Sequence, residues 1–185
     1  LDIMANYYFY EYGIKTKILA LFFVAIFGAI VIDTSAKIFA EIYDLGSVLA
    51  GYQSLGRYIL TLFNGDALFP DPNFSKIPKL KGETFVGLSA HILVSLMDTY
   101  LYFLLSFKIL KSKPKILPAL IMMWLFMFMP LYIDMPALGL GWAGAESPNQ
   151  DLFLLRTFIC HTCFGIALYA GTLLFYKLLK IYKSH

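Results

Sequence analysis

Residues 18–32 read ILALFFVAIFGAIVI and contain no charged side chain. Residues compatible with a helix continue to about residue 45. At a rise of about 1.5 Å per residue, a helix needs roughly 20 residues to cross the hydrocarbon core of a bilayer. A cleaved signal peptide begins in a similar way, but its apolar part is shorter than this one. We therefore predict a transmembrane helix over about residues 18–45.

Three further apolar stretches follow, over about residues 84–107, 116–133 and 152–179. As helices, all three reach the thickness of a bilayer, the third only barely. Hydrophobic residues make up 59% of the 185 residues and charged residues 15%, whereas soluble domains carry about 25% charged residues. The mean hydropathy is +0.70. We therefore predict an all-α membrane protein in which residues 1–185 form a single membrane domain, a bundle of four transmembrane helices.

Lysines predict the orientation of this bundle. Those of residues 108–115 fill the short loop between the second and third spans without an acid, and others flank the first and fourth spans. Short basic loops stay in the cytoplasm, so we expect both termini and residues 108–115 on that side, and residues 46–82 and 135–151 outside. The net charge of +3 reflects these lysines, and we expect no nucleic-acid partner. The lipid bilayer is the expected partner, while a homo-oligomer or another membrane protein stays open.

The first outer loop, residues 46–83, has a pattern typical of a helix on the membrane surface. Apolar residues recur in it at helical spacing, which predicts an amphipathic helix lying in the interface. They are Val48, Tyr52, Leu55, Ile59 and Leu62. The Asn64-Gly65-Asp66 triplet predicts the end of this helix, and the proline-rich residues 69–78 predict an irregular cap over the bundle.

Ionisable side chains at membrane depth are candidate functional residues, because each costs about 2.5 to 3.5 kcal/mol in a membrane helix. In the first span Asp33, Lys37 and Glu41 lie at spacings of four and share one helix face. Opposite charges at this spacing can pair. These residues therefore either have a function or form an ion-pair ladder that only orients the helix.

The second and fourth spans carry polar stripes at helical spacing. The stripes consist of Glu83, Gly87, His91, Ser95 and Asp98, and of His161, Gly165 and Tyr169. His91 and His161 lie about 11 and 13 Å from the outer ends of their helices, and small residues beside them are typical of helix contacts in lipid. We predict that the two histidines face one another in a single site. The alternative is two separate histidines, each hydrogen-bonded to a neighbouring helix.

Two arginines suggest an anion site. Arg57 belongs to the surface helix, and Arg156 lies one turn inside the outer end of the fourth span. A guanidinium group binds a carboxylate or phosphate bidentately, so together they could hold an anionic group. Alternatively, Arg156 extends outward to water or pairs with Glu41 or Glu83.

Cys160 and Cys163 form a Cys-x-x-Cys pair inside the fourth span. It is similar to the pair of quinone-linked thiol oxidoreductases that are built on four helices. Those enzymes need a second cysteine pair, and this chain has two cysteines in total. We therefore interpret both as small apolar packing residues.

Several elements, taken in order, resemble a bacterial family of small four-helix membrane proteins that is known as a domain of unknown function. These elements are Asp33, Gly56-Arg57, Gly82-Glu83, Ala90-His91, residues 136–141, Ser147-Pro148-Asn149, Arg156, His161 and Tyr169. The resemblance spans most of the chain. It implies the four-helix fold, a polar site and a location in the bacterial inner membrane, but no activity. The chain departs from the family pattern at residues 134–136, where Met-Gln-Pro is expected, and at Leu154, where another arginine is usual.

We hypothesise an outward-facing intramembrane pocket that binds or passes a small ion, a metal or a polar solute. Its expected lining is Asp33, Arg57, Glu83, His91, Asp98, Arg156, His161 and Tyr169. His91, His161 and Glu83 are the expected ligands of a divalent metal, and imidazole and carboxylate groups also relay protons. Two other classes stay open. One is a membrane redox protein or enzyme that holds a haem between the histidines or binds a quinone or lipid, and the other is a structural subunit of a larger complex.

Single cysteines at two positions test the orientation. In a chain without Cys160 and Cys163, we introduce Ser75→Cys or Ser112→Cys and add an impermeant thiol reagent to intact cells. Labelling is expected at position 75, because residues 46–82 are predicted to face outward, and not at position 112. Permeabilised cells, in which both positions react, are the control. Labelling at position 112 but not at position 75 would reverse the orientation.

Overall fold

The computed structural model describes residues 12–65, 74 and 77–183. All regular structure in these residues is helical. Four segments are long and apolar enough to cross a membrane, namely Ile14–Tyr43, Glu83–Ile109, Ile116–Ala137 and Gln150–Tyr182. The predicted all-α fold with four membrane-length helices is confirmed.

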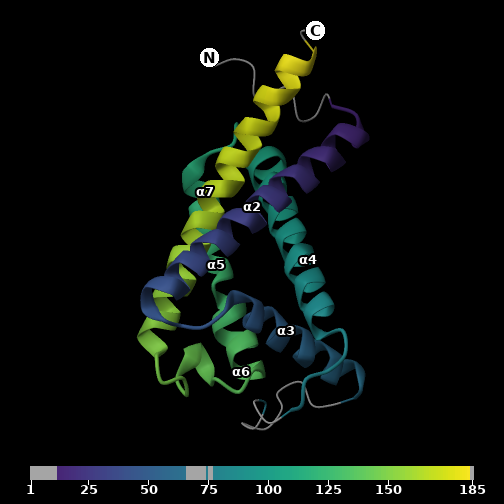
Figure 1. The fold of residues 1–185 in the computed structure, drawn as a ribbon. Helices are drawn as coiled ribbons and strands as arrows, with labels where there is room; N and C mark the ends of the chain where they lie inside the picture. The colour runs from purple at the N-terminus through teal and green to yellow at the C-terminus, as the bar shows by residue number, and fades with distance from the viewer. Residues whose placement is uncertain (1–11, 66–73, 75–76, 184–185) are drawn as a thin grey trace.

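The two longest helices, α2 (Ile14–Tyr43) and α7 (Gln150–Lys183), cross one another and make the most extensive contact in the bundle (Figure 1). Glycines allow this close approach. A Cβ atom at Gly28 would overlap the ring of Phe164, and a Cβ atom at Gly171 would come within 2.9 Å of the ring of Phe27. Each helix thus places a large aromatic ring against a glycine of the other, the kind of contact that holds helices together in lipid.

The second span begins as α4 (Glu83–Phe103) and continues as a π-helical turn, η2 (Leu104–Ile109). This span therefore ends close to the predicted residue 107. At its start, Gly82 has a φ of +88°, a conformation that favours glycine, and so turns the chain into α4.

The third span is helical from Ile116 to Ala137, but it is not a uniform α-helix over the predicted residues 116–133. The first part, α5 (Ile116–Phe126), ends early, and the wide turn η3 (Pro130–Asp134) and the short α6 (Met135–Ala137) continue the path. Pro130 explains the interruption, because proline has no N–H and its ring collides with the carbonyl four residues earlier. A 3₁₀ turn, η4 (Trp142–Gly144), follows before α7.

The loop between the first two spans contains the predicted additional helix, α3 (Val48–Phe63). Ser47 caps its start, since its hydroxyl accepts a hydrogen bond from the Leu49 N–H at 3.2 Å. Gly65, with a φ of +92°, lies in the turn that follows α3. Asp66 and most of the proline-rich stretch lie outside the described residues. In Figure 1, α3 lies across the end of the bundle opposite to the start of α2 and the end of α7.

The backbones of α3 and α4 touch at two glycines. A Cβ atom at Gly56 would overlap the carbonyl oxygen of Glu83, and one at Gly87 would overlap the carbonyl oxygen of Tyr52. No side chain separates the two helices at this point. The contact therefore sets the distance between α3 and α4 and the position of every side chain along their interface.

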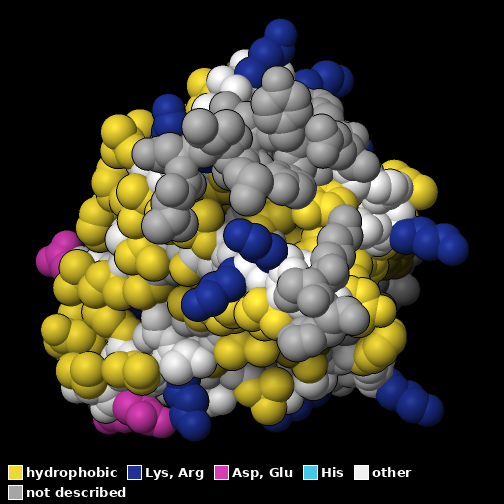
Figure 2. Space-filling model, turned by 90° about the horizontal axis from the view of Figure 1, so that it is seen from above, with side chains coloured by type: hydrophobic (Ala, Val, Ile, Leu, Met, Phe, Trp, Pro, Cys, Tyr) yellow, Lys and Arg dark blue, Asp and Glu magenta, His cyan; other side chains and the backbone are white. Residues whose placement is uncertain are grey.

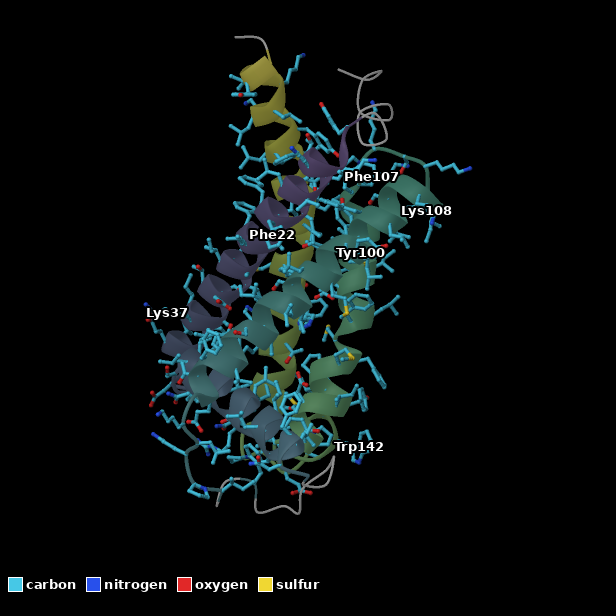
Figure 3. All side chains as sticks on the ribbon, turned by 90° about the vertical axis from the view of Figure 1, so that its right-hand side faces the viewer. Phe22, Lys37, Tyr100, Phe107, Lys108 and Trp142 are labelled. Atoms are coloured by element: carbon cyan, nitrogen blue, oxygen red, sulfur yellow. The ribbon has the colours of Figure 1, made fainter. Side chains whose placement is uncertain are left out.

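The surface of the bundle suits a lipid environment. Large apolar side chains are exposed along the spans, among them Phe22 at 47% and Tyr100 at 54%, both marked in Figure 3. The main buried cluster instead joins residues of α2, α4, α5 and α7, including the fully buried Val24, Tyr102 and Leu168. An apolar exterior around a packed core is the arrangement expected of helices in a bilayer.

Basic side chains gather at one end of the bundle. Figure 2 looks onto the end where α2 begins and α7 finishes, and it shows dark blue Lys and Arg side chains around this face. Lys108 extends from the same end in Figure 3, whereas Trp142 lies at the other. We call these ends the basic end and the α3 end.

The glycine contact predicts an unusual response to alanine. In an exposed helix, replacing glycine with alanine stabilises by about 1 kcal/mol. Gly56→Ala and Gly87→Ala are instead expected to destabilise the protein by about 1 to 3 kcal/mol, because the added methyl group has no space. The measurement is thermal unfolding of the detergent-solubilised protein.

Gly51→Ala is the matched control, since nothing lies within 4 Å of a Cβ atom at this α3 position. It should leave the unfolding temperature unchanged or raise it. Equal effects of all three substitutions would show that the contact between the two backbones is not tight.

Candidate functional site

Asp33, Tyr52 and His91 come together from α2, α3 and α4. Nε2 of His91 lies 3.1 Å from Oδ1 of Asp33. The hydroxyl of Tyr52 donates a hydrogen bond to the same carboxylate oxygen. The rings of Tyr52 and His91 have centroids 4.8 Å apart and are inclined at 38°. These three residues, which we call the Asp33 cluster, combine a carboxylate, a phenol and an imidazole in one contact.

The cluster lies within the membrane-length helices, toward the α3 end. His91 is about 12 Å along α4 from Glu83. Its side chain is 17% exposed, whereas that of Asp33 is 39% exposed. Nε2 of His91 is within ion-pair distance of Asp33 but is not aligned for a hydrogen bond, and it has no hydrogen-bond partner among the described residues. In the cluster, a buried imidazole nitrogen thus lies next to a carboxylate that is partly exposed.

The electrostatics of Tyr52 link the cluster to a fourth helix. Burial raises the pKa of the Tyr52 phenol, and the hydrogen bond to Asp33 raises it further. The positive charge of Arg156 on α7 lowers this pKa, which places the guanidinium within electrostatic reach of the phenol. Tyr52 therefore remains protonated and serves as a hydrogen-bond donor.

Next to the cluster, Arg57 of α3 holds Glu83 of α4. Nε and Nη2 of Arg57 donate to the two carboxylate oxygens at 2.8 and 3.1 Å, and Nη1 donates to the Ile77 carbonyl at 3.2 Å. The N–H of Leu80 donates to the same carboxylate at 3.0 Å. The two side chains are 12% and 6% exposed, and the pairing with Glu83 raises the pKa of Arg57. This is a buried bidentate ion pair that fastens α3 to the start of α4.

The sequence predicted that Arg57 and Arg156 could together hold an anion, but the structure gives the two arginines different partners. Arg57 is not free to bind an anion with Arg156, because its donors already bind Glu83 and Ile77. Among the described residues, no ion pair joins Glu83 to Arg156. Arg156 remains close to Tyr52 as a separate positive charge.

Of the ion-pair ladder expected along α2, only the pair of Lys37 and Glu41 is present. Lys37 and Glu41 lie 3.8 Å apart, and their side chains are 73% and 68% exposed. Lys37 points away from the bundle in Figure 3. Asp33 turns instead toward α3 and α4, where it contacts Tyr52 and His91. An exposed pair of this kind contributes little to stability, so Asp33 is the member of the stripe with a specific environment.

His161 has partners different from those of His91. Its Nδ1 lies 2.8 Å from the Thr157 carbonyl of its own helix, a contact in which Nδ1 must donate. His91 instead contacts α2 and α3. The sharing of one site by both histidines stays a prediction.

Two other expected site residues lie deeper. Asp98 is buried, at 6% exposure, and lies within electrostatic reach of His91. Tyr169 of α7 lies near Tyr102 of α4. Both are thus on the side of His91 that leads toward the basic end.

The residues expected to bind a divalent metal do not assemble. Within the described part of the chain, no three or more His, Cys, Asp or Glu side chains gather closely enough to hold an ion. Both carboxylate oxygens of Glu83 already accept hydrogen bonds from Arg57. The structure therefore does not bring His91, His161 and Glu83 together, and metal binding by these residues stays a prediction.

Tyr52 is the member of the cluster that sequence reasoning missed. Its position in the apolar stripe of α3 makes it look like a lipid-facing or core residue. The available signal was chemical, because a buried tyrosine hydroxyl usually finds a hydrogen-bond partner.

The sequence profile of DUF2938, a family of proteins of unknown function, matches residues 22–175. The chain belongs to this family. The expected relation to an uncharacterised family is thereby confirmed. We found no curated protein and no solved structure that matches the chain. The Asp33 cluster and Arg156 all lie within the region matched to DUF2938.

The Asp33 cluster of this DUF2938 protein has the groups needed to exchange a proton. An imidazole changes its charge near neutral pH. In the cluster, the imidazole of His91 lies next to the Asp33 carboxylate, which also accepts a hydrogen bond from the Tyr52 hydroxyl. The arrangement therefore contains two groups that can carry a proton, an imidazole and a carboxylate.

The Arg57–Glu83 pair predicts a strong effect of neutralising one partner. Glu83→Gln leaves the Arg57 guanidinium without its counter-charge and is expected to destabilise the protein. Adding Arg57→Gln should recover part of this loss, which a double-mutant cycle of unfolding free energies measures.

Glu41→Gln is the control, because it breaks the exposed pair with Lys37 and should cost less than about 1 kcal/mol. Independent, additive effects of Glu83→Gln and Arg57→Gln would contradict the described pairing.

Proposed function

We propose that this protein is a membrane protein that binds a small cation, the proton in the first place, at the Asp33 cluster and passes it across the bilayer. The observation that carries the proposal is the contact of 3.1 Å between His91 and a partly exposed Asp33 at membrane depth. Ionisable side chains inside a membrane are costly and mark ion pathways and proton relays. An imidazole beside a carboxylate is a pair of groups that can pass a proton between them, which is why the proton comes first.

The proposed orientation follows from the basic end. Basic segments favour the cytoplasmic side of a bacterial inner membrane, so α3 and the Asp33 cluster would face outward. Protons from outside would then reach Asp33 before His91, because Asp33 is the more exposed of the two.

The second candidate is a structural or accessory subunit. It is favoured by the fact that Asp33, Tyr52 and His91 join three helices and partly satisfy one another. In this case the cluster would lock the bundle, and neutral substitutions in it would change stability without affecting any ion movement.

Proton flux in vesicles separates the two candidates. The full chain is reconstituted into liposomes that contain a trapped pH-sensitive dye, and a potassium diffusion potential drives proton entry. The protein is expected to acidify the interior faster than the leak of protein-free vesicles. Asp33→Asn and His91→Gln should reduce the rate to that leak.

Glu41→Gln is the matched control, since it neutralises a carboxylate two turns further along α2, outside the cluster. It should retain the wild-type rate. Each variant is first checked for folding by size-exclusion chromatography and circular dichroism. A wild-type rate equal to that of protein-free vesicles would reject proton passage in favour of the structural candidate.

A further inference from the structure

α4 carries a second polar feature beyond the Asp33 cluster. On the side that packs into the bundle, its buried residues include Ser95, Asp98, Thr99 and Tyr102, with exposures of 3%, 6%, 0% and 0%. Other α4 side chains, such as Met97, are exposed and apolar, as expected against lipid. These polar groups of α4 are therefore buried inside the protein.

Helix geometry aligns this buried face with His91. Asp98 follows His91 by seven residues, which is nearly two full turns, so the two side chains share one face at a separation of about 10 Å along the axis. Ser95 lies on the same face between them. Asp98 is within electrostatic reach of His91, and no ion pair or hydrogen bond joins it to another side chain in the described residues.

The polar face continues toward the basic end. The hydroxyl of Tyr102 donates a hydrogen bond to the Lys115 carbonyl at 3.3 Å, and the buried Ser106 lies beside this hydroxyl. Tyr169 of α7 is the titratable neighbour from the opposite helix. Lys115 immediately precedes α5, in the lysine-rich loop of residues 110–115. Buried polar groups thus follow α4 from the Asp33 cluster to this loop.

An unpaired carboxylate is an expensive residue to bury. If Asp98 served only to fasten helices, a hydrogen-bond donor or a cation from a neighbouring helix would be expected beside it, as Arg57 is beside Glu83. The described residues provide none. A carboxyl group in such a place is instead suited to taking up a proton, which removes its charge.

We propose that Asp98 is a second proton-binding site, coupled to His91 and located between the Asp33 cluster and the basic end. In the transfer step, a protonated His91 loses a proton from the ring nitrogen that does not face Asp33. The Ser95 hydroxyl accepts this proton and gives up its own, and an O–H bond forms on Asp98. Imidazolium and carboxylate become neutral imidazole and carboxylic acid, and charge is conserved.

Onward transfer from Asp98 leads to Tyr102 and Ser106 at the basic end. This directional role rests on the proposed function, whereas the protonation of Asp98 and its coupling to His91 do not. Two measurements on the reconstituted full chain therefore test the two parts separately.

The first measurement is the rate of proton entry into liposomes, in the assay described for the proposed function. Asp98→Asn, which is nearly isosteric, is expected to reduce the rate to that of protein-free vesicles, and Asp98→Glu to keep part of the wild-type rate. Asp134→Asn is the matched control, because it neutralises another carboxylate of a membrane-length segment outside this face. Wild-type flux in Asp98→Asn would overturn the onward transfer through Asp98 and leave the proposed function intact.

The second measurement is infrared spectroscopy of the protein in lipid. The wild type is expected to show the carbonyl band of a protonated carboxylic acid that shifts in D₂O, disappears in Asp98→Asn and moves in His91→Gln. If Asp98→Asn does not fold, displacement of the band in Asp98→Glu assigns it instead.

The outcomes of the two measurements are distinct. A band that responds to both Asp98 and His91, without any wild-type flux, would support the coupled proton site while rejecting the proposed function. Absence of the band, or a band that neither Asp98 variant alters, would overturn the inference.

Discussion

The backbone contact between Gly56 and Gly87 determines the geometry of the α3 end. α3 is too short to span a bilayer, so its position depends on what it packs against. With no side chain between the two helices, the Tyr52 carbonyl rests on Gly87, one turn before His91. The ring of Tyr52 is thereby placed against that of His91. The neighbour of Gly56, Arg57, is equally placed to reach Glu83.

These neighbouring contacts have different physical roles. The Arg57–Glu83 pair is bidentate, almost fully buried and supported by two backbone groups, which makes it a fastening between helices. In the Asp33 cluster the hydrogen bonding is incomplete, because Nε2 of His91 has an ion-pair partner but no aligned hydrogen bond. The two contacts therefore differ in how completely their polar groups are paired.

The sequence predicted the membrane spans well because hydropathy and length report directly on the bilayer. It also identified Asp33 and His91, because an ionisable residue within an apolar span can be recognised in the sequence before its partner is known. Partners were harder to predict. Helical spacing shows which residues of one helix share a face, but not which face of another helix they meet, so the pairing of Arg57 with Glu83 was missed. Tyr52 was not recognised as a site residue because it belongs to an apolar stripe. The irregular part of the third span near Pro130 is a local backbone effect, which hydropathy does not detect.

The proposed passage of protons requires that His91 gains and loses a proton inside the membrane. The most direct measurement is nitrogen NMR of the histidine-labelled full chain in lipid bilayers, with His91→Gln used to assign the signal. If protons pass through the Asp33 cluster, the His91 ring is expected to convert reversibly between its neutral and charged forms when the pH of the surrounding water is changed. Asp33→Asn is expected to alter this conversion. A His91 signal that stays constant over the whole pH range in which the protein remains folded would contradict the proposed passage of protons.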